Sequence, residues 1–167
     1  MHVGRIFVLV GAVLAPLGLP LKALVMDDVD HLPALSEAVP GIPDGAPTIF
    51  DGLDTWAQIV VVMLLVAVVV LALLPPIKQP QDRVSAGITG LAGVAIFVYA
   101  YVKFAVALND ADAINSAVDQ LGEVPEEIEV GMANAGFGFW LIIIGSALIA
   151  IGGVVGFRAR KRSSEDA

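Results

Sequence analysis

Four long apolar stretches separated by polar segments dominate the chain, and each is long enough to form a membrane-spanning helix. A helix needs roughly 20 apolar residues to cross a hydrocarbon core about 30 Å thick. The stretches cover approximately residues 6–26, 57–74, 84–108 and 134–157. The first contains Lys22 and the third Lys103, and the other two carry no charge. The pattern predicts an all-α integral membrane protein, a single membrane domain over residues 1–167 with four antiparallel transmembrane helices.

The first stretch also allows a second interpretation, as a secretory signal peptide. Arg5 precedes an apolar run, as a basic n-region would. However, no small-x-small cleavage site follows Leu21, and apolar residues continue past Lys22 to Met26. We therefore favour a span over about 6–26, and cleavage would leave the other three spans in the same orientation.

Basic and acidic residues separate to opposite ends of the predicted bundle. Short loops rich in Lys and Arg stay in the cytoplasm. In a four-span arrangement seven basic residues share one side: Arg5, Lys78, Arg83, Arg158, Arg160, Lys161 and Arg162. All but three of the 17 acidic residues lie in the two segments on the other side, about 27–55 and 109–133. The chain is therefore predicted to lie in the cell membrane, with both termini, including a basic tail over 158–167, in the cytoplasm and an acidic cap outside.

The polar segments predict three different local structures. Four prolines and three glycines in the first outer segment, about 27–55, favour turns and extended coil over a long helix. The prolines of residues 75–83 predict a tight inner turn, which makes the second and third spans an antiparallel pair. Apolar residues at three- and four-residue steps predict a short amphipathic helix over about 110–121.

Prolines also mark expected features of the first and fourth helices. Pro16 and Pro20 predict a kink in the first. Pro125 favours a helix start, and three acidic residues would then lie in its first turns, where they interact favourably with the helix dipole: Glu126, Glu127 and Glu129. On this interpretation the fourth helix projects beyond the membrane on the outer side.

Small residues recur every seven positions in three of the four stretches. They are Gly4, Gly11 and Gly18; Ala86, Gly93, Ala100 and Ala107; and Gly131, Gly138, Gly145 and Gly152. Membrane helices pack closely along small residues, and a period of seven keeps one face against a partner. We assign most of this packing to contacts within one chain, while Gly152 and Gly156 form a GxxxG pair that could meet another subunit. The second stretch, rich in Val and Leu, is predicted to face lipid.

Composition narrows the possible functions. The chain is 57% hydrophobic and 16% charged, with a mean hydropathy of +0.86, which excludes an ordinary soluble domain. A net charge of −8 argues against nucleic-acid binding. The absence of cysteine excludes disulfides, thiolate metal sites and a cysteine nucleophile. Both histidines lie outside the spans, no acid lies at mid-depth, and no nucleotide-binding or hydrolase motif is present. We therefore expect neither an enzyme nor a cofactor.

Two groups of charged residues remain as candidate sites. Lys22 and Lys103 lie near the outer ends of their spans, where a long side chain snorkels to the interface. Alternatively they pair with acids of the outer segments, as a latch between the first and third helices, or with anionic lipid headgroups. Four residues are weak candidate ligands for a divalent cation: Asp27, Asp28, Asp30 and His31. Their spacing matches no calcium or zinc signature, so a solvated acidic loop is the preferred interpretation.

The outline of four spans, cytoplasmic termini and a larger first outer loop is similar to the tetraspan plan of claudin-like proteins. Their first loop carries a Gly-Leu-Trp group and two cysteines, which this chain lacks, so no residue role is carried over. The leading hypothesis is a non-enzymatic accessory or scaffold subunit that packs beside a larger membrane complex, or beside copies of itself. Its acidic cap would attract a basic soluble partner. The alternative is a small oligomeric channel or transporter whose outer acids concentrate cations.

Overall fold

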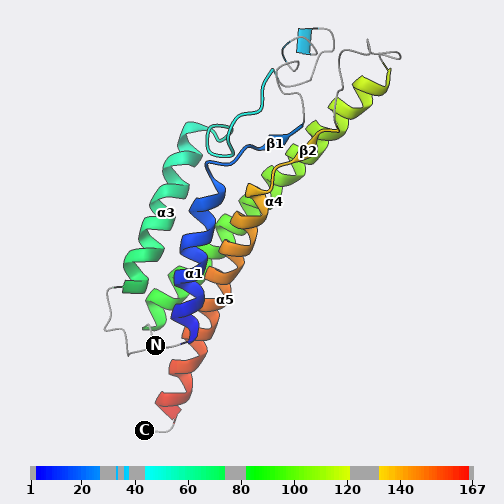
Figure 1. Ribbon diagram of the computed structural model, residues 1–167. Coiled ribbons are helices and arrows are strands. Elements are labelled where there is room, and N and C mark those ends of the chain that lie inside the picture. The colour runs from blue at the N-terminus through cyan, green and yellow to red at the C-terminus, as the bar shows by residue number, and fades with distance from the viewer. Residues whose placement is uncertain are drawn as a thin grey trace.

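The structure is an elongated helical bundle with a small β-ladder at one end (Figure 1). The computed structural model describes residues 3–26, 33, 36–37, 44–73, 82–120 and 132–165. The elements used below are α1 (Val3–Gly18), β1 (Leu24–Val25), α3 (Thr55–Leu73), α4 (Arg83–Gln120), β2 (Asn134–Ala135) and α5 (Gly138–Glu165).

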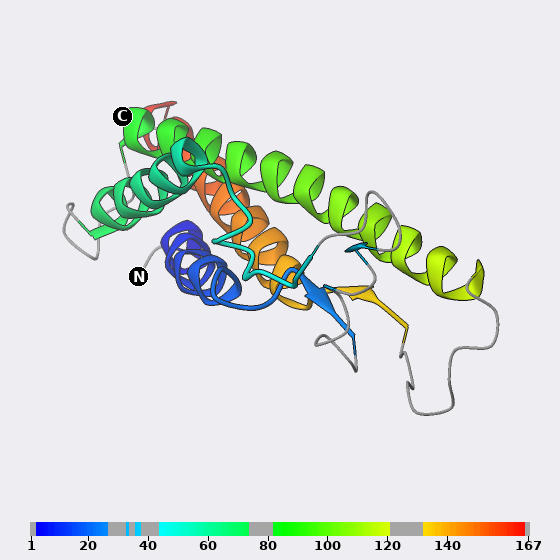
Figure 2. The same ribbon diagram turned by 90° about the horizontal axis from the view of Figure 1, so that it is seen from above.

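Three helices are long and apolar enough to cross a membrane: α3, α4 from Arg83 to Asp119, and α5 from Gly138 to Phe157. Helix α1 is apolar but has 16 residues, which is about 24 Å at 1.5 Å per residue. Helix α5 packs against both α1 and α4, and Figure 2 shows it between them. The spans of α3 and α4 are more exposed than that of α5, since 28% of each is buried against 44% for α5.

Helix α1 ends earlier than the apolar pattern predicts. The span expected over 6–26 is helical only to Gly18, and a turn and an extended segment follow. Pro20 explains the difference, because it has no N–H to continue the helix and its ring clashes with the carbonyl four residues before it. Pro16 lies within the helix, and Pro20 follows its last residue by two positions. Lys22 consequently lies outside the helix, on the extended segment.

Helix α4 is longer than expected, and α5 begins later. The short helix predicted over 110–121 is the continuation of the third span, since neither Gly nor Pro interrupts the chain after Leu108. Its 38 residues measure about 57 Å, nearly twice the thickness of a hydrocarbon core. The predicted helix start at Pro125 is wrong for α5, which begins at Gly138 after β2. The helix that projects at this end is therefore α4, not α5.

At the opposite end α5 continues past Phe157 to Glu165, so most of the predicted tail is helical. No Gly or Pro follows Gly156 to interrupt the helix. Residues 74–81, which hold most of the predicted inner turn, lie outside the described residues. The start of α1 and the end of α5 lie at this same end of the bundle (Figure 1).

The segment after α1 lies between two other extended segments. Strands β1 and β2 pair antiparallel, with Leu24 opposite Ala135. On the other side Lys22 forms a bridge with Thr48. Backbone hydrogen bonds continue both pairings, from the Ala23 N–H to the Pro47 carbonyl (2.9 Å) and from the Gly136 N–H to the Ala23 carbonyl (2.8 Å). These contacts tie the ends of α1, the first loop and the start of α5 into one layer.

Helices α1 and α5 pack with their backbones in contact along a line of glycines. The pairs are Gly4 with Gly152, Gly11 with Gly145, and Gly18 with Gly138. A step of seven residues toward the C-terminus on α1 therefore corresponds to a step of seven residues toward the N-terminus on α5, as expected for antiparallel helices. A Cβ atom built on Gly4 would lie 2.8 Å from the Gly152 carbonyl oxygen, and one on Gly152 would lie 2.5 Å from the Gly4 carbonyl oxygen. Larger side chains at these positions would force the helices apart.

A second close contact joins α4 to α5. A Cβ atom on Gly93 would lie 2.5 Å from the backbone nitrogen of Ala150, and one on Gly153 would lie 2.5 Å from the backbone nitrogen of Gly90. The other small residues of the α4 heptad are at most 5% exposed: Ala86, Ala100 and Ala107. Helix α5 therefore presents small residues to both neighbours, which explains its central position.

The GxxxG pair on α5 meets α1 of the same chain, contrary to the suggestion that it contacts another subunit. A Cβ atom on Gly4 would lie 3.0 Å from the backbone nitrogen of Gly156 as well as close to Gly152, and both α5 glycines are buried. The reason is the seven-residue register of the glycines, which places Gly4 of α1 opposite Gly152 and Gly156 of α5. Gly131 lies outside the described residues.

Candidate functional site

The end of the bundle that carries the β-ladder is acidic, and it is the candidate functional region. We call it the head and define it by residues 19–26, 44–54, 109–120 and 132–137. Five aspartates of the head are exposed: Asp44, Asp51, Asp54, Asp112 and Asp119. Asp110 is half-buried, and Lys22 is the basic residue of the head. The head therefore presents a negatively charged surface.

Asn115 fixes the projecting part of α4 to the rest of the head. Its side-chain amide donates to the Ala133 carbonyl (3.1 Å), and its side-chain oxygen accepts from the Ala133 N–H (2.8 Å). These bonds satisfy both backbone groups of a residue that is only 2% exposed. Ala111 and Ile114 are buried beside them, at 2% and 0% exposure. The projecting helix is thus braced along one side and leaves its acidic face exposed.

The first loop is fixed to the bundle by side-chain and backbone hydrogen bonds. The Thr48 hydroxyl donates to Asp51 Oδ2 (2.7 Å) and accepts from the Asp51 N–H (3.1 Å), which closes a tight turn. Gln58 on α3 donates to the Phe50 carbonyl (3.0 Å). Ile49 and Leu53 are buried below the turn. The described part of this loop is a packed layer over the bundle.

Lys103 lies at the boundary between the bundle and the head. A cavity of about 150 Å³ opens here between α4, the first loop and the start of α5, and its lining includes Lys103, Asp110 and Phe139. The Lys103 ammonium is 5.9 Å from the centre of the Tyr99 ring, a cation–π contact. The cavity combines a mostly apolar wall with one cation and one carboxylate.

The suggested latch involves Lys22 and Lys103, and only two of its four suggested acidic partners, Asp110 and Asp112, lie among the described residues. In the part of the chain that the structure describes, no ion pair joins either lysine to an acid. Lys22 is exposed, and Asp112 is exposed on the projecting part of α4. Asp27 and Asp28, the other suggested partners, lie outside the described residues, as do Asp30, His31, Glu126, Glu127 and Glu129.

Aromatic side chains cluster at the same level as Lys103. The Trp56 and Tyr99 rings meet edge to face at 6.2 Å, and Phe104 contacts the rings of Phe139 at 5.7 Å and Trp140 at 5.5 Å. Trp56 and Trp140 are both about half exposed, at 61% and 49%. Tryptophan and tyrosine concentrate at membrane–water interfaces. The cluster therefore lies at the boundary between the bundle and the head.

Among the described residues, the polar side chains that are almost fully buried belong to α1, α4 and α5 and lie outside the head. Arg5, Thr89 and Ser146 are at most 2% exposed, and the Ser146 hydroxyl donates to the Ile143 carbonyl within its own helix (3.0 Å). Among the residues described, no three potential metal ligands come together. Arg5, placed by its sequence at the basic end, is buried in the first turn of α1.

Comparison with known proteins gives no further guide to the site. Neither a protein-family model, nor a curated protein, nor a solved structure matches this chain. Its function must therefore be inferred from its own geometry.

Proposed function

We propose that this chain is a non-enzymatic accessory or scaffold subunit of a membrane complex, and that its head is the surface a partner recognises. The observation that supports this most directly is the braced continuation of α4. A helix that projects about 18 Å past Leu108 is held by Asn115 and buried alanines while Asp112 and Asp119 stay exposed. We call this projecting part of α4, residues 109–120, the arm. It keeps its charges at fixed positions, as recognition by a partner requires.

The bundle serves in this proposal as the rigid support of the head. Its small-residue seams join α1, α4 and α5 within one chain, so they hold the support together and are not free for a partner. We propose that α1 is a fourth crossing although it is short. Its glycine pairs extend from Gly138 to Gly152, which covers most of the α5 span, and the two helices therefore share the same membrane depth.

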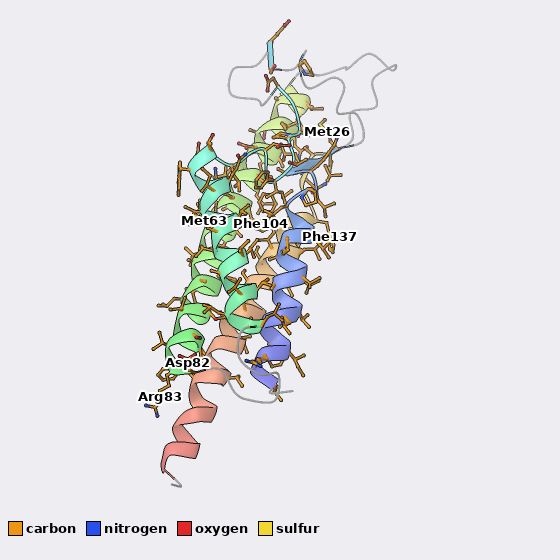
Figure 3. All side chains as sticks on the ribbon, turned by 90° about the vertical axis from the view of Figure 1, so that its left-hand side faces the viewer. Met26, Met63, Asp82, Arg83, Phe104 and Phe137 are labelled. Atoms are coloured by element: carbon orange, nitrogen blue, oxygen red, sulfur yellow. The ribbon has the colours of Figure 1, made fainter. Side chains whose placement is uncertain are left out.

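The orientation proposed is head outside and both termini in the cytoplasm. Basic residues follow the α5 span directly, at Arg158, Arg160, Lys161 and Arg162, and Arg83 starts α4 at the same end. Figure 3 places Arg83 and Met26 at opposite ends of the bundle. An excess of Lys and Arg in short flanking segments favours the cytoplasmic side.

The acidic head suits a partner with a basic surface. Exposed charges of one sign raise the rate of encounter with the opposite sign, and salt weakens this effect because the Debye length falls to about 8 Å at physiological ionic strength. Association should therefore be strongest at low salt.

The alternative function, a small cation channel or transporter, requires several chains. The described bundle is closed by buried aliphatic side chains, among them Val8, Val68 and Ile149, all 0% exposed, so in this proposal the cation path would lie between chains. Flux measured with the purified protein in liposomes separates the two functions, because cation leakage would favour the channel.

Neutralising the arm tests the accessory function. Asp112→Asn with Asp119→Asn should reduce recovery of a stoichiometric partner severalfold after gentle detergent extraction at low salt, with a smaller difference at high salt. Glu165→Gln with Asp166→Asn is the matched control, because it changes the net charge equally at the opposite end and should leave recovery unchanged. Equal recovery from all three proteins would contradict the proposal.

A further inference from the structure

An apolar groove runs between α4 and α5 in the half of the bundle away from the head. Its volume is about 270 Å³, and its walls include Gly87, Gly90 and Leu91 on α4 and Gly153 and Phe157 on α5. The close contact between α4 and α5 forms the floor of the groove at Gly90, where an added Cβ atom would lie 3.8 Å from Gly153 Cα. At Gly87 nothing lies within 4 Å of the Cβ position, so the groove is open there.

The groove ends at a basic rim. Arg83 lies four residues before Gly87 and so on the same face of α4, and its side chain is exposed. Figure 3 shows this side chain directed away from the bundle. On α5, positions 160 and 161 follow Phe157 by three and four residues and continue the groove-lining face, and they are Arg160 and Lys161. On both helices, basic residues therefore come next along the face that lines the groove, and we call these residues, Arg83, Arg160 and Lys161, the basic rim.

An acidic residue, Asp82, also lies beside this rim, where it caps a helix. The Asp82 carboxylate accepts a hydrogen bond from the Ser85 N–H (3.4 Å) at the start of α4. Arg83 is the next residue, and four further bases follow Phe157 within five residues, ahead of two acids at Glu165 and Asp166. The rim therefore keeps an excess of positive charge.

We propose that this groove binds one acyl chain of an anionic phospholipid, whose phosphate lies against the basic rim. The groove holds about 270 Å³ and is lined by apolar side chains and glycines, a surface that suits a single hydrocarbon chain. The apolar walls accept the chain, and the rim selects a negative headgroup over a zwitterionic one. Basic pockets between membrane helices on the cytoplasmic side commonly bind such headgroups.

The proposal is tested with the full-length protein in detergent, titrated with phosphatidylglycerol or with phosphatidylcholine of the same acyl chains. Native mass spectrometry measures the lipid-bound fraction. The wild type should bind phosphatidylglycerol more tightly than phosphatidylcholine. Arg83→Gln should weaken phosphatidylglycerol binding about fivefold and leave phosphatidylcholine binding unchanged, because a basic residue near an anionic lipid surface contributes about that factor.

A second variant fills the groove. Gly87→Leu should reduce the binding of both lipids, since its side chain would occupy the open part of the groove. Ala105→Leu is the matched control, because it adds the same bulk to an exposed position of α4 outside the groove and should bind both lipids as the wild type does. If Gly87→Leu does not fold, the Arg83→Gln comparison still decides the proposal.

Three results would overturn the inference. One is equal binding of the two lipids by the wild type, and another is wild-type binding of phosphatidylglycerol by Arg83→Gln. The third is a dimer of the wild type that Gly87→Leu converts to a monomer with no change in bound lipid, which would make the groove a contact between two copies.

Discussion

Replacing Gly11 with alanine tests the contact that holds α1 against α5. A Cβ atom at this position would overlap the carbonyl oxygen of Gly145 and lie 2.8 Å from Ile149 Cγ1 and 3.0 Å from the Ile149 backbone nitrogen. Backbone atoms cannot rotate away, so the helices must separate. Overpacking typically costs about 1–3 kcal/mol, and the better helix propensity of alanine offsets about 1 kcal/mol. We expect a net loss of up to about 2 kcal/mol in the free energy of unfolding.

The assay is reversible unfolding in mixed detergent micelles, followed by the fluorescence of Trp56 and Trp140. Gly87→Ala is the control, because both positions are helical glycines but nothing lies within 4 Å of a Cβ at Gly87. That variant should be as stable as the wild type or up to about 1 kcal/mol more stable. Equal stability of Gly11→Ala and Gly87→Ala would refute the close packing of α1 on α5.

Two further predictions concern the head and the orientation of the bundle. Asn115→Ala should speed hydrogen exchange of the Ala133 amide by about 5- to 150-fold, because a buried donor left unsatisfied costs about 1–3 kcal/mol. Asn109→Ala, at an exposed position on the same helix, should leave this exchange rate unchanged. Equal exchange rates in the two variants would contradict the role of Asn115 in fixing α4 to the head. Because the chain has no cysteine, Asp112→Cys and Ser163→Cys each introduce a unique thiol. An impermeant maleimide added outside should label the first and reach the second only after permeabilisation; labelling of both in intact cells would contradict the orientation.

The local pattern predicts the apolar cores of the helices well. The stretch expected over 57–74 matches α3 at Thr55–Leu73 within two residues. Helix formation in an apolar stretch depends on neighbours three and four positions away, which the sequence displays directly. The seven-residue spacing of small residues likewise identified positions that lie in helix contacts, but the spacing could not say which helices pair.

Features that depend on contacts distant in the sequence were not predictable in this way. The end of α1 at Gly18 is accompanied by pairing of its next residues with segments more than 20 and more than 100 positions away. Pro20 carried the local signal and was interpreted as a kink. Asn115 was missed, although it lies beside Ile114 on the face that the periodicity predicts to be buried. A lone amide on such a face indicates a polar partner.

Recognition of a partner through the head is tested most directly by photo-crosslinking in native membranes from a single reactive residue at position 112. We predict one crosslinked protein of defined mass from this position, formed more efficiently at low salt. A reactive residue at the exposed position of Val66, on α3, serves as the comparison and should crosslink mainly to lipid. Efficient protein crosslinks from position 66 with none from position 112 would contradict recognition through the head.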